Sequence, residues 1–234
     1  MFSKITAYYD KIYAWKDYCT EVEDLTDVIH ENLRSEGKRL LDVACGTGRH
    51  VEYLKQHFDV EGLDVSQEML ELAQQRNPDV PFHHADMTHF ELGNKFDVVT
   101  CLFSSIGYVR TLENLIRAVN CMTQHLLPGG LLVIEPWLTP DVYQPGRIHA
   151  NFVDEPDLKI ARISTGRVEG RLSILDMHYL IGTQGNVTHL VECHQLAMFE
   201  NEEMHEVLAN AGLEVSYDAE GLMFRGLFIG CRKG

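Results

Sequence analysis

The 234-residue sequence predicts an α/β fold, in which a mostly parallel sheet carries helices on both faces. One observation is that short apolar runs alternate with helical patterns through the first part of the chain, as they do in βαβ units. Another is a change of rhythm from about residue 138, after which extended stretches with two distinct faces predict an antiparallel β insertion. The length suits a single hydrophobic core, so we expect one domain.

The first part of the chain supplies the helices and strands of the parallel sheet. A helix is expected within residues 18–34, because its apolar residues recur at spacings of three and four and share one side. Further helices are expected after Ser66 and after Thr111, whose side chains can cap them. Between the helices, apolar runs predict strands at residues 39–44, 60–65, 80–85, 96–103 and 131–134, the last announced by a turn at 128–130.

Residues 138–199 are predicted to be largely antiparallel strands with loops, lying beside or over the α/β core. Residues 171–181 have two alternating faces, and a turn at 182–186 leads into another extended segment. A last helix is expected from its cap Asn201 to Gly212, before two strands separated by a loop that carries Arg225. The predicted parts of the domain are a helical cap (1–37), the core (38–137), the insertion (138–199) and a C-terminal helix with strands (200–234).

Composition excludes several classes of function. With 20 basic and 35 acidic residues the formal net charge is −15, which argues against a nucleic-acid clamp. No apolar stretch is long enough to predict a membrane span, and the N-terminus has no signal-peptide pattern. The six cysteines are scattered without a C-x-x-C pair, so we expect reduced thiols and a cytoplasmic location. No metal site is expected either, because the adjacent His83 and His84 of a strand point to opposite faces.

Two glycines fall where a strand must turn into a helix. They are Gly46 and Gly48, and the absence of side chains there lets a ligand approach the backbone. A dinucleotide-binding fingerprint is the competing interpretation, but it would need a third glycine where this chain has Val51. A purely structural turn would also explain two glycines, so neighbouring residues must decide.

Three acidic residues end successive predicted strands at the edge where open α/β sheets bind ligands. They are Asp42, Asp64 and Asp86. A carboxylate at Asp64 can accept hydrogen bonds from both ribose hydroxyls of an adenosine-type cofactor, and Asp86 can accept from an adenine amino group. This acidic edge would repel a pyrophosphate but would attract a cofactor that carries a positive sulfonium and no phosphate.

These motifs resemble those of the class I S-adenosylmethionine-dependent methyltransferases. The resemblance implies a Rossmann-like, mostly parallel seven-stranded sheet, with S-adenosylmethionine as the cofactor and S-adenosylhomocysteine as its product. It covers roughly residues 38–135 and rests on Leu41–Gly48, Gly62–Ser66, Ala85–Met87 and Leu127–Gly130.

A narrower resemblance extends over nearly the whole chain, to the N,N-dimethyltransferases of nucleotide-linked amino sugars such as the desosamine and mycaminose enzymes. It implies transfer of a methyl group to a small-molecule amine, with the amino group of a dTDP-type sugar as the best candidate. An enzyme of the same fold with an O- or C-acceptor, and a non-catalytic cofactor-binding protein, stay open as alternatives, as does a homodimer. The motifs are Lys16–Tyr18, Phe103–Tyr108, Glu135–Trp137, Ala161–Ser164 and Arg225–Phe228.

The resemblance also implies roles for individual residues. The glycines would line the methionine end of the cofactor, and two tyrosines near the N-terminus would close over it. The implied cofactor-binding residues are Tyr13, Tyr18, Asp42, Ala44, Cys45, Gly46, Gly48, Asp64, Val65, Met69, Asp86, Met87 and Phe103. The implied substrate-binding residues are Ser105, Tyr108, Trp137, Arg162, His178 and Arg225, with Arg225 at the phosphates of the nucleotide.

Methyl transfer from a sulfonium is an in-line displacement, so alignment matters most and a general base is optional. We expect Tyr13, Tyr108 and His178 to position the amine, with His178 as its proton acceptor if the protein supplies one. Structural interpretations stay open beside these: His178 on a polar strand face, Tyr108 as a packing aromatic, and Arg162 in a surface salt bridge like Arg167 and Arg171.

Overall fold

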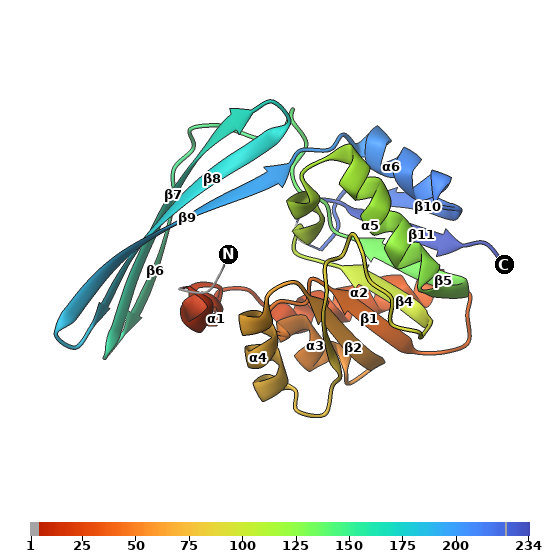
Figure 1. Cartoon of the computed structure of the whole chain (residues 1–234), viewed down its shortest axis with the longest axis horizontal. Helices are drawn as coiled ribbons and strands as arrows, with labels where there is room; N and C mark the ends of the chain where they lie inside the picture. The colour runs from red at the N-terminus through yellow and green to blue at the C-terminus, as the bar shows by residue number, and fades with distance from the viewer. Residues whose placement is uncertain (1–4, 223) are drawn as a thin grey trace.

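The computed structural model describes residues 5–222 and 224–234 and arranges them around two sheets. The larger has the strand order β10-β11-β5-β4-β1-β2-β3 (Figure 1). Its neighbouring strands pair in parallel, except that β11 runs antiparallel to β5 and β10. The predicted fold class is thereby confirmed. The strands are β1 (Arg39–Val43), β2 (Asp59–Asp64), β3 (Phe82–His84), β4 (Phe96–Cys101), β5 (Leu126–Ile134), β10 (Leu213–Asp218) and β11 (Leu227–Arg232).

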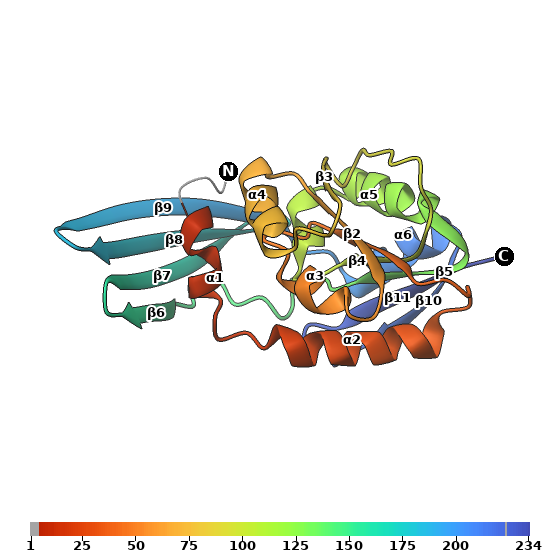
Figure 2. The same cartoon turned by 90° about the horizontal axis from the view of Figure 1, so that it is seen from below.

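Helices cover both faces of this sheet, because successive residues of its strands are apolar on both sides. In β1, Leu40 and Leu41 are fully buried and belong to separate core clusters. The cluster of Leu40 includes residues of α2 and α3, and that of Leu41 includes residues of α5 and α6, so α2 and α5 lie on opposite sides (Figure 2). In the described part of the chain, no helix combines the length and apolar character of a membrane span. The helices are α2 (Tyr18–Asn32), α3 (Arg49–Leu54), α4 (Gln67–Arg76), α5 (Leu112–Gln124) and α6 (Asn201–Asn210).

The predicted helix caps are confirmed at two helices and wrong at a third. The side chains of Ser66 and Thr111 accept hydrogen bonds from backbone N–H groups of α4 and α5. The cap of α6 is Glu200 rather than Asn201, which is already the first helical residue. Glu200 and Glu203 form a reciprocal capping box that satisfies two backbone donors, which a lone Asn201 side chain would not do.

The glycine turn before the predicted strand 131–134 lies inside that strand. β5 begins at Leu126, and its pairing with β4 shifts register between Phe96 and Val98. Gly129 has a φ of 77°, and its carbonyl accepts hydrogen bonds from the N–H groups of Arg34 and Ser35, at 3.0 and 3.1 Å. The turn residues therefore form an irregularity that bends β5 toward the chain after α2.

The second sheet contains four antiparallel strands, as predicted for the insertion, and extends away from the larger sheet (Figure 1). Short N-terminal helices, η1 (Thr6–Tyr8) and α1 (Tyr9–Ile12), pack against one of its faces, where Ile12 meets Ile160 and Tyr179. We call this the inner face and the opposite one the outer face. The strands are β6 (His149–Glu155), β7 (Leu158–Glu169), β8 (Leu172–Thr183) and β9 (Asn186–Ala197).

Candidate active site

The loop between β1 and α3 turns through left-handed backbone conformations. Ala44, Gly46 and Gly48 have φ values of 60°, 55° and 71°, and Gly48 is the N-cap of α3. A Cβ built on Gly46 would meet no atom within 4 Å, so the backbone there borders open space. The loop therefore offers exposed backbone to a ligand, as the two glycines predict.

Asp64, at the end of β2, holds this loop in place. Its Oδ2 accepts a hydrogen bond from the N–H of Gly46 at 2.8 Å, and its Oδ1 accepts one from the N–H of Ser66, also at 2.8 Å. Burial raises the pKa of the Asp64 carboxyl, although these backbone donors oppose the shift. A carboxylate fixed at this edge is suited to receive hydroxyl donors.

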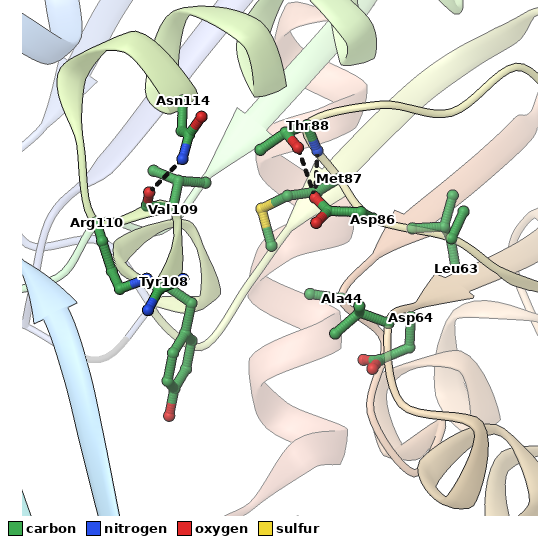
Figure 3. Close-up of a pocket in the computed structure, with 12 residues that line it drawn as sticks. Ala44, Leu63, Asp64, Asp86, Met87, Thr88, Tyr108, Val109, Arg110 and Asn114 are labelled. Carbon is green, nitrogen blue, oxygen red and sulfur yellow. Dashed lines mark hydrogen bonds between the residues drawn. The ribbon is translucent and has the colours of Figure 1, made fainter. Parts of the chain in front are cut away.

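A pocket opens beside Asp64 at the carboxyl edge of the larger sheet. Tyr108 and Arg110 lie on one side, Ala44 and Asp64 on the other, and Asp86 and Met87 between them (Figure 3). Asp86 Oδ1 accepts from the N–H and hydroxyl of Thr88, at 2.8 and 2.7 Å. This mixture of apolar surface and two carboxylates fits an adenosine. The complete lining is Ala44, Leu63, Asp64, Val65, Ala85, Asp86, Met87, Thr88, Tyr108, Val109, Arg110 and Asn114.

Asp42 does not line that pocket. It is 1% exposed, its Oδ1 accepts from the Thr100 hydroxyl at 2.9 Å, and burial raises its pKa to about 6. Unlike Asp64 and Asp86, Asp42 is therefore buried within the larger sheet, on β1 just before the glycine loop. Cys45 and Met69 are likewise buried, and the N–H of Met69 donates to the Ser66 hydroxyl that caps α4.

The two predicted N-terminal tyrosines, Tyr13 and Tyr18, have different surroundings. The ring of Tyr13 meets Phe103 edge-on at 5.4 Å between centroids, and the Arg162 guanidinium of β7 lies 4.9 Å from the Tyr13 centroid. Tyr18 is buried against the ring of His50, at 4.9 Å. Tyr13 is thus placed to face a ligand between the sheets, whereas Tyr18 belongs to the packing beneath.

Two buried charged residues near these rings are missing from the sequence prediction. Lys16 pairs with Glu21 and lies between the rings of Tyr18 and Phe103, 4.9 and 4.8 Å from their centroids. Glu135 is fully buried, and its Oε2 accepts from the Phe103 N–H at 2.6 Å. This bond holds the turn after β4, where Phe103 and the following residue have φ values of 53° and 60°. Both residues belong to motifs that carry the narrower resemblance, Lys16–Tyr18 and Glu135–Trp137, and Glu135 also directly follows an apolar strand.

Arg225 lies where the loops after β4 and β5 meet. Its Nη1 donates to the Ser104 hydroxyl at 3.0 Å and is 3.9 Å from Glu135 Oε1. The guanidinium also lies 5.4 Å from the Trp137 ring, whose Nε1–H donates to the Ser173 hydroxyl at 2.8 Å. Ser105 begins the short helix η2 (Ser105–Val109) that carries Tyr108.

Arg162, Arg167 and Arg171, three of the arginines in the insertion, separate into two groups. Arg162 is 8% exposed on the inner face, and its Nη2 is 2.5 Å from Asn151 Oδ1. Arg167 and Arg171 form exposed ion pairs, Arg167 with Asp176 and Arg171 with Glu203 of α6. The salt-bridge interpretation therefore describes Arg167 and Arg171 but not Arg162.

The structure does not bring His178 to the other predicted residues. Its strand partners are Ile163 and Val191, which are 48% and 52% exposed on the outer face, and its ring stacks on His189 at 5.4 Å. A different histidine of the same hairpin, His194, points inward. Its Nδ1 lies 2.8 Å from the Tyr108 hydroxyl.

Comparisons with known proteins cover both the cofactor edge of the larger sheet and the four-stranded sheet. A family model described as a methyltransferase domain matches residues 40–130, which contain the glycine loop and the acids. The dTDP-3-amino-3,6-dideoxy-alpha-D-glucopyranose N,N-dimethyltransferase of Streptomyces fradiae is 38% identical over 97% of this chain and 90% of its own. That alignment includes the four-stranded sheet.

Solved structures agree. DesVI of Streptomyces venezuelae superposes with a TM-score of 0.89 at 36% identity, over 96% of this chain and 98% of its own. The S-adenosylmethionine-bound CalS10 of Micromonospora echinaspora, described as an amino pentose methyltransferase, superposes with a TM-score of 0.87 at 37% identity, over 97% and 95%. The chain therefore belongs to the S-adenosylmethionine-dependent methyltransferases, in the family that includes the dTDP-amino-sugar N,N-dimethyltransferases.

Proposed function

We propose that the protein transfers methyl groups from S-adenosylmethionine to the amino group of a dTDP-linked amino sugar. The observation that carries this proposal is the relationship to enzymes with that activity, at 36–39% identity across both the cofactor edge and the four-stranded sheet. An O- or C-acceptor is not favoured, since the sugar enzymes match over more than nine-tenths of this chain.

The cofactor would occupy the pocket at the carboxyl edge of the larger sheet. Asp64 would accept from the ribose hydroxyls, Asp86 and Met87 would frame the adenine, and the backbone of Gly46 and Gly48 would border the methionine end. When bound, S-adenosylmethionine supplies an electrophilic methyl group on a sulfonium. The protein then needs chiefly to align the amine, and collinear positioning can contribute roughly 7–11 kcal/mol to lowering the barrier.

The acceptor would lie between the pocket and the inner face of the four-stranded sheet. Tyr13 and Tyr108 would contact the sugar, and Arg162 and Arg225 would hold the nucleotide phosphates. Both arginines are sheltered, Arg225 with a side chain 24% exposed, in a protein whose net charge is −15. Such local positive charge is suited to a diphosphate, and each charge-assisted bond contributes about 1.5–3 kcal/mol.

The test is methylation of amino sugars with and without the nucleotide. We expect mass spectrometry to show methyl addition to a dTDP-amino sugar and much weaker turnover of the free sugar. Arg225→Ala should raise KM for the nucleotide-linked substrate by about 10-fold or more, equivalent to the loss of a charged hydrogen bond. Arg171→Ala is the matched control, because Arg171 pairs with Glu203 at the surface. Equal KM values in the two variants would remove Arg225 from the phosphate site, and methylation of hydroxyls alone would overturn the proposed reaction.

We propose that the protein acts in the cytoplasm. All six cysteines are free thiols, which suits a reducing compartment. A homodimer also stays a prediction, and the surface that would support it is the apolar outer face, where Phe152 and Leu180 are 73% and 50% exposed. Light scattering on wild type and Phe152→Asp decides it.

A further inference from the structure

Three polar side chains form a row from the pocket into the four-stranded sheet. Tyr108 lines the pocket, and its hydroxyl lies 2.8 Å from Nδ1 of His194. On the other side of the imidazole, Nε2 lies 3.4 Å from Oε2 of Glu192. The side chains of His194 and Glu192 are each 10% exposed. The row therefore connects the pocket to a sheltered carboxylate through one imidazole.

One arrangement of protons along this row suits the transfer of a proton away from the pocket. Burial raises the pKa of Tyr108 far above its usual value, so the phenol keeps its proton. With the Tyr108 hydroxyl as the donor across the 2.8 Å contact to Nδ1, the imidazole proton lies on Nε2, facing Glu192. A phenol oxygen can accept a hydrogen bond while its O–H donates one.

An aliphatic amine is mostly protonated at neutral pH, and an ammonium has no lone pair with which to attack. We infer that His194, acting through Tyr108, takes up the proton that the acceptor ammonium loses before methyl transfer. This inference rests on the proposed function, because only an amine acceptor brings such a proton. A second methylation needs the same step again, since the first yields another ammonium.

The proton transfer balances within these groups. An N–H bond of the ammonium breaks as an O–H bond forms at Tyr108, and the original hydroxyl proton of Tyr108 moves to Nδ1 of His194. The amine becomes neutral, Tyr108 returns to a phenol, and His194 becomes an imidazolium beside the Glu192 carboxylate. Because Glu192 is negative, it stabilises that imidazolium. The proton then leaves to solvent and restores the neutral ring.

Among the described residues, charged and titratable groups face the Tyr108–His194 pair from several elements. Glu192 lies on β9 beside His194, and Tyr179 of β8, Tyr9 of α1 and Tyr13 at the end of α1 lie near Tyr108. Arg162 of β7 approaches Tyr13 and Tyr179. Arg162 is the cation of this group and is held by Asn151 and by the ring of Tyr13. Glu192 is the carboxylate nearest the imidazole and therefore has the larger influence on it.

Replacement of His194 by asparagine separates proton uptake from hydrogen bonding. The amide oxygen of His194→Asn can still accept from Tyr108 but cannot hold a proton. Near neutral pH we expect kcat/KM to fall by about 100-fold, the lower end of the range for general acid–base catalysis. Activity should recover at higher pH, where the substrate amine arrives already neutral, and the cofactor Kd should stay unchanged. His178→Asn is the matched control on the outer face of the same hairpin and should keep the wild-type profile.

A wild-type pH profile in His194→Asn would overturn the relay. Tyr108→Phe interrupts the same route, and it gives the second test if His194→Asn does not fold. Nitrogen NMR of the histidines in wild-type protein is independent of turnover. We expect a His194 signal with the proton on Nε2, and a changed His194 signal in Tyr108→Phe. A proton on Nδ1 would contradict the relay. If wild-type protein methylates hydroxyls and no amine, the proposed function is wrong. The NMR measurement then still tests separately whether Tyr108 donates a hydrogen bond to His194.

Discussion

The two sheets of this protein face one site and build their sides of it in different ways. At the carboxyl edge of the larger sheet, the site is formed by backbone in left-handed conformations and by short carboxylate side chains. Asp64 holds this backbone by accepting a hydrogen bond from the N–H of Gly46. On the four-stranded sheet, alternate side chains of long, regular strands face the site, among them Arg162 and His194. Cofactor binding should therefore be sensitive to backbone changes, and acceptor binding to single side chains.

A pair of glycine substitutions tests this difference most strongly. Gly48→Ala puts a Cβ 2.9 Å from Asn77 Nδ2 and 3.1 Å from Ala73 Cβ, at a φ of 71°. The left-handed strain and overpacking together should lower the free energy of unfolding by about 2–5 kcal/mol and weaken cofactor binding. Gly185→Ala, in the β8–β9 turn with a φ of 75°, would meet nothing within 4 Å and should cost about 1–2 kcal/mol. Urea unfolding measures the free energy of unfolding of each variant, and calorimetry measures its cofactor Kd. Equal losses of stability and of cofactor affinity in the two variants would contradict the proposed difference between the two sheets.

The buried Asp42 gives the next largest effect, on pH dependence. Burial raises its pKa to about 6 from an ordinary value of 3.8. As pH rises, Asp42 therefore loses its proton at a lower pH in the unfolded chain than in the folded protein. The folded state then binds more protons between about pH 4 and 6, and the free energy of unfolding falls as pH rises through that window, by up to about 3 kcal/mol.

Urea unfolding of the cofactor-free protein over this pH range measures that slope. Asp42→Asn should remove the contribution of Asp42 to this slope. Asp86→Asn should retain that contribution, because Asp42 is unchanged. If the slope is the same in wild type and Asp42→Asn, the proton is held elsewhere.

The same difference between the sheets explains what the sequence can predict. Around the glycine loop, each candidate site residue lies at or just after the end of an apolar strand. Gly46, Asp64 and Asp86 can therefore be placed at the carboxyl edge of the sheet without knowing how the strands pair. On the insertion, side chains alternate with a period of two, and a choice of the wrong face sends every residue to the other side. The sequence of β8 shows two alternating faces but does not indicate which of them faces the site. The choice of His178 as a site residue assumes the face that the structure places outward.

The signal that identifies the inner face lies in β9. Glu192 and His194 are neighbours on one face of β9, and Leu190 and Leu196 flank the pair on the same face. That pattern predicts sheltered polar groups, but only the pairing with η2 brings His194 to Tyr108. The burial of Asp42 against Thr100 of β4 likewise depends on packing that no local motif contains.

Asp64 offers a test confined to the cofactor side. In Asp64→Ala the N–H groups of Gly46 and Ser66 lose their acceptor, and we expect the cofactor to bind more weakly by about 1.5–3 kcal/mol. Asp64→Asn keeps one acceptor oxygen and should lie between that variant and wild type. Glu192→Gln, on the other sheet, should leave the calorimetric Kd unchanged. Wild-type affinity in Asp64→Ala would show that the ribose binds elsewhere.

The smallest expected effect concerns α1, which contacts both the glycine loop and the four-stranded sheet. Asp10 accepts from the Thr47 hydroxyl at 2.7 Å and pairs with Arg76 at 2.5 Å, so it ties α1 to the cofactor loop. The adjacent Lys11 pairs instead with Glu155 of β6, at 2.6 Å. Asp10→Asn should weaken cofactor binding by up to about 1 kcal/mol, in line with a partly exposed ion pair, and Lys11→Met should leave it unchanged.

Salt distinguishes these two contacts further, because added ions screen a pair in proportion to its exposure. The side chains of Asp10 and Arg76 are 29% and 21% exposed, whereas those of Lys11 and Glu155 are 44% and 43% exposed. The effect of Asp10→Asn on the cofactor Kd should therefore persist at a salt concentration that removes any effect of Lys11→Met on the acceptor KM. If Asp10→Asn changes the acceptor KM and leaves the cofactor Kd alone, α1 serves the four-stranded sheet only, and it does not link the cofactor loop to the acceptor side.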